Sequence, residues 1–174
     1  MNPQQVKEES LQVRKEMKKH LGRDLPLDGR MGAWSPLEVF HHVLLVNQLS
    51  LNILERLFSR AKDLPENHPL TLWPVREELG VFPLERAFSV PAFTGTDPDR
   101  LVTLETLEAL EKEEAEKYAS LLDKSSPYDC SGLIFPHPLM GRMNFYKWIY
   151  FGVVHERLHL EKLIGDLELN ESSK

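Results

Sequence analysis

Apolar residues recur every three or four positions along four stretches of the chain, a spacing that predicts amphipathic helices. No stretch of useful length combines alternating β-branched residues with hairpin turn signals, so we expect an all-α protein. The first predicted helix covers residues 4–21, and Gly22 is suited to its end. Its inward side carries Val6, Val13, Met17 and Leu21.

The second predicted helix has the strongest start signal in the sequence. Ser35 is placed as N-cap, Pro36 takes the first helical position, and Glu38 completes a capping box. This helix should run from Pro36 to about Ala61. A fourth helix is expected to open at Asn144 and to continue through "FYKWIYFGVVHERLHLEKLIGDLEL".

A third helix is predicted to begin after Asp97 as N-cap, with Pro98 following, and to stop before Pro127. Its acidic residues are expected to form a solvated outer face. These acidic residues are Glu111, Glu113, Glu114 and Glu116. The residues expected to face inward are Leu101, Leu104, Leu107, Leu110, Tyr118 and Leu122.

Residues 62–97 form a long proline-rich crossover between the second and third helices. It contains Pro65, Pro69, Pro74, Pro83 and Pro91, too many for one helix. A connection of this length joins distant ends of parallel helices, covers a functional site, or does both. Residues 127–143 are predicted to be a second irregular connection. The arrangement indicates an all-α chain with four helices.

Composition narrows the class of protein. A chain of 174 residues suits a single domain, 1–174, and its 27 acidic against 21 basic residues give a net charge of −6, which argues against a nucleic-acid partner. The polar start and the short apolar runs predict no signal peptide and no membrane span, hence a cytoplasmic protein. Cys130 is the one cysteine, so any metal would depend on histidine and carboxylate.

The stretch "HERLH", residues 155–159, matches H-E-x-x-H, in which two histidines bind zinc and the glutamate is the base of a metalloprotease. Only 15 residues follow His159, which leaves almost no place for a downstream third ligand. The longer metzincin form fails because this chain has Lys162 and Gly165 where glycine and histidine are needed. We therefore disfavour the protease and interpret Glu156 as a helix-surface residue, retained only as a weak candidate base.

His155 and His159 are four residues apart, so both imidazoles can reach one ion from a single helix face. A third ligand is sought on the second helix, where His42 is in phase with the apolar stripe while His41 is expected to point away and to be partly exposed. His20, His68 and His137 lack comparable spacing. Gly152, one turn before His155, would either leave room for a bound molecule or permit close helix packing.

Two motifs resemble the DinB/YfiT-like superfamily. "WSPLEVFHH" is similar to its second-helix motif, and "HPLMGRMNFYKWIYFGVVHERLHLEKL" is similar to its final-helix motif. The resemblance implies a four-helix bundle that holds nickel or zinc through His42, His155 and His159. The chain departs from the family pattern at two positions. Asn47 stands where the family often has an acidic residue, and Lys162 stands where it often has glutamine. Asn47, Lys162 and Gly152 are expected at the pocket.

Many members of this superfamily are called metal-dependent hydrolases, and others use low-molecular-weight thiols such as bacillithiol, mycothiol or glutathione. The resemblance therefore implies a thiol-dependent S-transferase or a hydrolase that acts on small molecules. Thiol transfer would need no protein cysteine, whereas hydrolysis would need a base such as Glu156. The alternative is a non-enzymatic bundle that binds a metal or a small ligand. Dimers occur among relatives, so a homodimer is left open.

Overall fold

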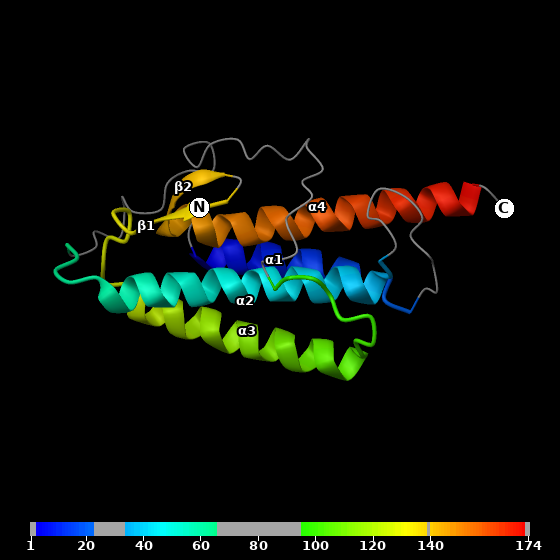
Figure 1. Ribbon diagram of the computed structural model, residues 1–174, viewed down its shortest axis with the longest axis horizontal. Helices are drawn as coiled ribbons and strands as arrows, with labels where there is room; N and C mark the ends of the chain where they lie inside the picture. The colour runs from blue at the N-terminus through cyan, green and yellow to red at the C-terminus, as the bar shows by residue number, and fades with distance from the viewer. Residues whose placement is uncertain (1–2, 23–33, 66–94, 139, 173–174) are drawn as a thin grey trace.

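Four long helices lie side by side in the computed structural model, which describes residues 3–22, 34–65, 95–138 and 140–172 (Figure 1). Helix α2 packs against both α3 and α4, and α1 packs against α4. The predicted four-helix bundle is confirmed. The elements are α1 (Pro3–Lys18), α2 (Pro36–Arg60), α3 (Leu104–Ser125), β1 (Ile134–His137), β2 (Gly141–Asn144) and α4 (Phe145–Ser172).

Helix α2 begins where the capping box predicts. The Ser35 hydroxyl accepts a hydrogen bond from the Glu38 backbone N–H at 3.3 Å, and the Glu38 carboxylate accepts one from the Ser35 N–H at 2.7 Å. These two bonds satisfy backbone donors that the first helical turn would leave without partners. The predicted first and last helices are likewise observed, within a few residues of the expected ends.

Helix α3 begins six residues later than predicted. Thr103, and not Asp97, is the N-cap, and its side chain accepts from the Thr106 N–H at 3.2 Å. As a result Leu101, which was expected to face inward, is 85% exposed. Leu104 is also exposed, whereas Leu107 is fully buried as predicted.

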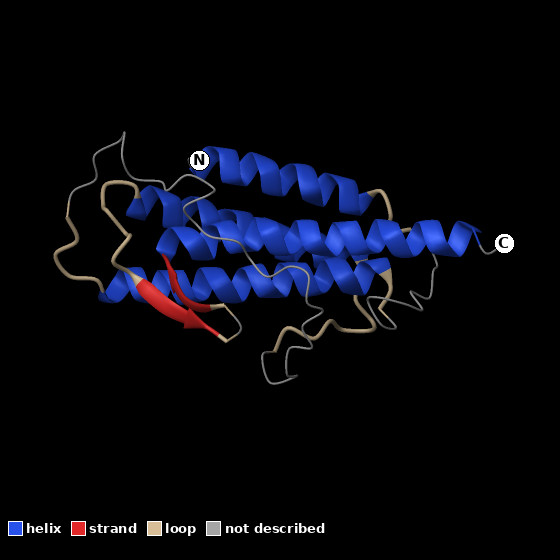
Figure 2. Ribbon diagram, turned by 90° about the horizontal axis from the view of Figure 1, so that it is seen from above, coloured by secondary structure: helices blue, strands red, loops and turns tan. Residues whose placement is uncertain are grey.

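A short β-hairpin occupies part of the connection that was predicted to be irregular (Figure 2). Strands β1 and β2 are antiparallel, with Phe135 opposite Met143. Each strand has four residues and β1 contains Pro136, so neither shows the alternation by which strands are recognised in a sequence. The indole N–H of Trp148 donates to the Phe135 carbonyl at 3.0 Å and fastens the hairpin to α4.

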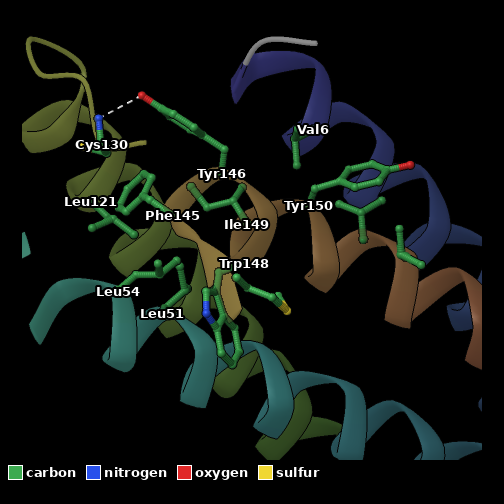
Figure 3. Packing of buried hydrophobic residues seen from close by; sticks show 13 residues of the cluster. Val6, Leu51, Leu54, Leu121, Cys130, Phe145, Tyr146, Trp148, Ile149 and Tyr150 are labelled. Atoms are coloured by element: carbon green, nitrogen blue, oxygen red, sulfur yellow. Dashed lines mark hydrogen bonds between the residues drawn. The ribbon is translucent and has the colours of Figure 1, made fainter. Parts of the chain in front are cut away.

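The apolar core has two parts, one at each end of the bundle. The part nearest the hairpin is shown in Figure 3, where Tyr146 accepts a hydrogen bond from the Cys130 backbone N–H. It includes Val6, Leu51, Leu54, Leu121, Trp148 and Val153. The second part includes Val13, Met17, Val39, Phe40, Val43, Leu44, Leu107 and Leu163.

Polar residues from all four helices lie between the two apolar parts and form what we call the polar layer. The layer is held by ion pairs and hydrogen bonds that join α1 to α3 and α4, and α2 to α4. Its members are Ser10, Arg14, Asn47, Glu114 and Glu156.

Residues 66–94, most of the predicted crossover, lie outside the described residues. Its role as a connection or a cover therefore stays a prediction. Among the helices that are described, none has both the length and the apolar character required to cross a bilayer.

Candidate metal centre

Three histidines that are distant in sequence converge between α2 and α4. One ring nitrogen from each of His42, His155 and His159 lies within 4.8 Å of the other two. The Nε2 atoms of His155 and His159 are 3.0 Å apart. Two nitrogens bound to one tetrahedral zinc ion would be about 3.3 Å apart, because each Zn–N bond is about 2.0–2.1 Å. The pair is therefore close to the spacing that a shared ion needs.

His42 is oriented by the chain that precedes α3. Its Nδ1 lies 2.7 Å from the Thr96 carbonyl oxygen, and because a carbonyl only accepts, Nδ1 carries the proton. This hydrogen bond leaves Nε2 as the nitrogen with a free lone pair. Histidine ligands of metals are commonly held in this way by a partner on the other ring nitrogen.

Burial keeps the three imidazoles neutral. It lowers the pKa of His155 well below the usual value, with a further lowering from His159 and His42. Burial likewise lowers the pKa of His159 to about 3, and it lowers the pKa of His42 despite the hydrogen bond to Thr96. Neutral imidazole is the form that binds metal ions, so this donor set fits a divalent ion that prefers nitrogen ligands.

Two further ring nitrogens of the cluster are buried. The Nδ1 atoms of His155 and His159 have no hydrogen-bond partner within the described part of the chain. The Nε2 atoms of the two rings lie within hydrogen-bond distance of each other, and an ion bound by both would take the place of this contact.

Aromatic rings surround the cluster. Trp34 lies 5.0 Å from the His42 ring, and Phe151 lies 5.6 Å from the His155 ring, measured between centroids. His137 of β1 packs on Phe151 at 4.7 Å and on Trp148 at 5.2 Å. The structure thus brings His137, which the sequence spacing did not single out, to the wall of the site.

His41 is not the partly exposed residue that the helix phase predicted. Its side chain is 8% exposed, and its Nδ1 accepts a hydrogen bond from the Asp99 N–H at 3.1 Å. His41 and His42 therefore both hold the segment that leads into α3, one through Asp99 and the other through Thr96. This tertiary contact also explains why Asp97 does not cap a helix.

The interpretation of Glu156 as a helix-surface residue is wrong. The residue is 0% exposed, and its carboxylate accepts from Arg14 Nε at 2.8 Å, from Asn47 Nδ2 at 2.5 Å and from Ser10 Oγ at 2.8 Å. Burial raises the pKa of Glu156, while the Arg14 charge opposes this rise. With both oxygens engaged by the polar layer, Glu156 is a poor candidate for a base at the histidines.

The polar layer contains charges that the sequence analysis missed. Arg14 bonds both Glu156 and Glu114, and these carboxylates raise its pKa although burial alone would lower it. Glu114 was expected on a solvated face but is 7% exposed. The sequence did contain one indication that Arg14 is buried, because Arg14 falls on the predicted inward side of α1 between Val13 and Met17.

The three residues expected at the pocket do not lie together: Asn47 and Gly152 lie on one side of α4, and Lys162 lies on another. A Cβ at Gly152 would lie 3.0 Å from Asn47 Oδ1, so the missing side chain permits close packing of α2 on α4. Both residues line a cleft on the side of the polar layer. Lys162 is instead on the side of the histidines, where its positive charge lowers the pKa of His155 and His159.

The fold and the cluster define a four-helix bundle with a candidate three-histidine metal centre. The solved structure of TT2238, described as a four-helix bundle protein, is similar, with a TM-score of 0.59 and 23% sequence identity. The alignment covers 94% of this chain and 99% of that one, and at this identity it shows the fold alone. No protein-family model and no curated protein matches the chain.

Proposed function

We propose that the protein is a divalent-metal-dependent enzyme of the DinB/YfiT-like type that transfers groups to or from a low-molecular-weight thiol. The observation that carries the proposal is the convergence of three neutral imidazoles from two helices. His42, His155 and His159 would hold the ion, with nickel or zinc favoured by an all-nitrogen donor set. A divalent ion held this way acts as a Lewis acid and lowers the pKa of a coordinated thiol or water.

The hydrogen bonds of Glu156 favour thiol transfer over hydrolysis. Hydrolysis needs a base near the ion, and the carboxylate of Glu156 is instead bound by Arg14, Asn47 and Ser10. Three neutral ligands leave the charge of a divalent ion uncompensated, which suits an anionic thiolate. Lys162 adds positive charge on the same side. The aromatic rings of Trp34 and Phe151 would limit water and pack against an apolar substrate group.

Metal analysis of the purified protein, after incubation with nickel or zinc and removal of free ions, tests the centre. The wild type should bind about one ion per chain, and His42→Gln should bind at least tenfold more weakly. His41→Gln is the matched control, because His41 is the preceding buried histidine but lies outside the cluster. Metal bound equally by His42→Gln and the wild type would overturn the assignment.

A second assay tests the reaction. The metal-loaded protein is supplied with glutathione or bacillithiol and an aryl halide, and loss of free thiol is followed. The proposal expects turnover that disappears in His42→Gln and persists in His41→Gln. Stoichiometric metal with no thiol consumption, but with ester hydrolysis, would favour the hydrolase. Metal without either activity would favour the alternative, a bundle that binds a metal or a small ligand.

A further inference from the structure

One side of the four-helix bundle is packed less closely than the other three. Helix α1 packs on α4, α4 on α2, and α2 on α3, whereas α1 and α3 are joined by the ion pairs Arg14–Glu114 and Lys18–Glu111. A cleft of about 400 Å³ lies on this side and is lined by residues of all four helices. Its volume is in the range of small-molecule sites, and none of the three histidines of the candidate metal centre lines it.

Most of the surface that lines the cleft is apolar. Leu11 of α1 is 51% exposed, and the aromatic residues Tyr118 of α3 and Trp148 of α4 line the same space. Further apolar lining comes from Val6, Leu51 and Val153. A molecule bound here would remove apolar surface such as that of Leu11 from water, which is favourable.

The charged side chains that line the cleft balance one another. Four are basic, namely Lys7, Arg14, Lys18 and Lys112, and four are acidic, namely Glu108, Glu111, Glu114 and Glu156. Arg14 is paired with both Glu114 and Glu156, and Lys18 is paired with Glu111. A charged ligand would therefore lose its hydration without meeting an excess of opposite charge, which is unfavourable.

The neutral polar side chains of the cleft are engaged within the protein. Ser10 Oγ donates to the Glu156 carboxylate at 2.8 Å, and Ser50 Oγ donates to a backbone carbonyl of its own helix at 2.9 Å. Asn47 Nδ2 donates to Glu156, and Asn47 Oδ1 packs so close to Gly152 that a Cβ there would lie 3.0 Å away. A ligand would therefore be recognised mainly through apolar contact.

We propose that the cleft binds a neutral small molecule with an apolar, ring-containing body. The apolar lining and the rings of Tyr118 and Trp148 would contact this body, and the balanced charges select against ions. A small molecule fits better than another helix, which is about 10 Å wide, because the ion pairs of Arg14 and Lys18 join α1 to α3 along the cleft. This site is independent of the metal centre and of the proposed reaction.

Isothermal titration with three naphthalene derivatives that share one ring system tests the preference for a neutral ligand. The neutral 1-naphthalenemethanol should bind saturably at one site per chain. The cationic 1-naphthylmethylamine and the anionic 1-naphthoate should bind at least tenfold more weakly, because neither meets an excess of opposite charge. Higher salt concentration should not weaken binding of the neutral compound. Absence of saturable binding by the neutral compound, or equal binding of either ion, would overturn the proposal.

Two matched pairs of variants locate the ligand. Ala115 lines the cleft, whereas Ala119, one turn later on α3, is exposed and does not. Ala115→Leu should fill part of the cleft and weaken binding of 1-naphthalenemethanol at least tenfold, and Ala119→Leu should leave it unchanged. Leu11 and Leu49 are both exposed, but Leu49 does not line the cleft, so Leu11→Ser should weaken binding and Leu49→Ser should not. Equal binding within either pair of folded variants would overturn the proposal.

Two further measurements identify the occupant of the cleft. In an amide NMR spectrum of the wild type, 1-naphthalenemethanol should shift the signals of Ala115 and Gly152, which line the cleft, while the signal of Ala119 stays in place. Shifts confined to residues around the three histidines would refute the proposed site. Sedimentation that shows a dimer in the wild type and a monomer in Leu11→Ser would assign this side of the bundle to a second copy of the chain and would also refute it.

Discussion

Glu156 forms an ion pair with Arg14 at 2.7 Å, although it directly follows His155 of the histidine cluster. Consecutive helical residues are rotated by about 100°, which directs these two side chains toward different neighbours. His155 meets α2 at His42, and Glu156 meets α1 at Arg14. The five residues "HERLH" therefore contribute to two separate structures, a candidate metal centre and the polar layer.

Removal of the Arg14 charge should destabilise the protein strongly. Arg14→Met leaves Glu114 and Glu156 buried without their cation, and breaking a buried ion pair in this way costs about 3–5 kcal/mol. Urea unfolding followed by circular dichroism measures the loss. Lys19→Met, in the turn directly after the same helix, is the control, because its ion pair with Glu16 is exposed and should contribute little. Equal losses in the two variants would contradict the role given to the polar layer.

Glu156→Gln should separate stability from metal binding. The change lowers the free energy of unfolding because the amide cannot match the charged bonds to Arg14, but it leaves all three imidazoles in place. Metal content should equal that of the wild type, whereas His155→Gln should lose the ion. A folded Glu156→Gln protein without metal would show that the carboxylate belongs to the centre after all.

Two glycines of α4 should respond differently to alanine. At Gly165 an added Cβ meets nothing within 4 Å, so Gly165→Ala should stabilise the helix by about 1 kcal/mol. At Gly152 the Cβ would lie 3.0 Å from Asn47 Oδ1, and Asn47 is held by its bond to Glu156. Gly152→Ala should therefore be about 1–3 kcal/mol less stable than Gly165→Ala.

A double variant checks the cause. Adding Asn47→Ser to Gly152→Ala removes the atom that the new methyl group approaches. If the contact is the reason, the two changes are not additive. Thermal or urea unfolding should then show that the double variant loses less stability than the sum of the losses in the two single variants. Strict additivity would mean that Gly152 is required for another reason.

The metal-free protein should lose stability as the pH falls below about 6.5. Burial lowers the pKa of His159 to about 3, so between these values the unfolded chain binds a proton that the folded chain does not. The free energy of unfolding then decreases by about 1.4 kcal/mol per pH unit for each such histidine. Urea unfolding with a chelator, from pH 8 to pH 5, should show a shallower decline in His159→Gln. Parallel curves would contradict the lowered pKa.

Features that depend on residues close together in the sequence were predictable from the sequence. The capping box at Ser35 fixed the start of α2, and the four-residue spacing placed His155 and His159 together. The start of α3 was missed because Asp97 and Pro98 form a plausible local cap, while the backbone on either side is held by His41 and His42. Such competition between local and tertiary bonds is not visible in a short stretch of sequence.

The polar layer could not be found by the same reasoning. Arg14 lies 142 positions from Glu156 and 100 positions from Glu114, and charged residues on helices are usually exposed. Only the packed bundle shows that these charges satisfy one another. The hydrophobic period determines which helix face is inward, but it does not identify a polar residue on that face as one half of a pair.

Helix α4 makes specific contacts on two sides: its histidines contact the His42 ring of α2, and Glu156 forms hydrogen bonds with α1 and α2. Inserting one residue before His155 would turn the rest of the helix by about 100° and advance it by about 1.5 Å, which breaks both sets of contacts at once. Apolar side chains tolerate small displacements, whereas hydrogen bonds and ion pairs depend on position and direction. Insertions and deletions within α4 should therefore be excluded even where substitutions are accepted.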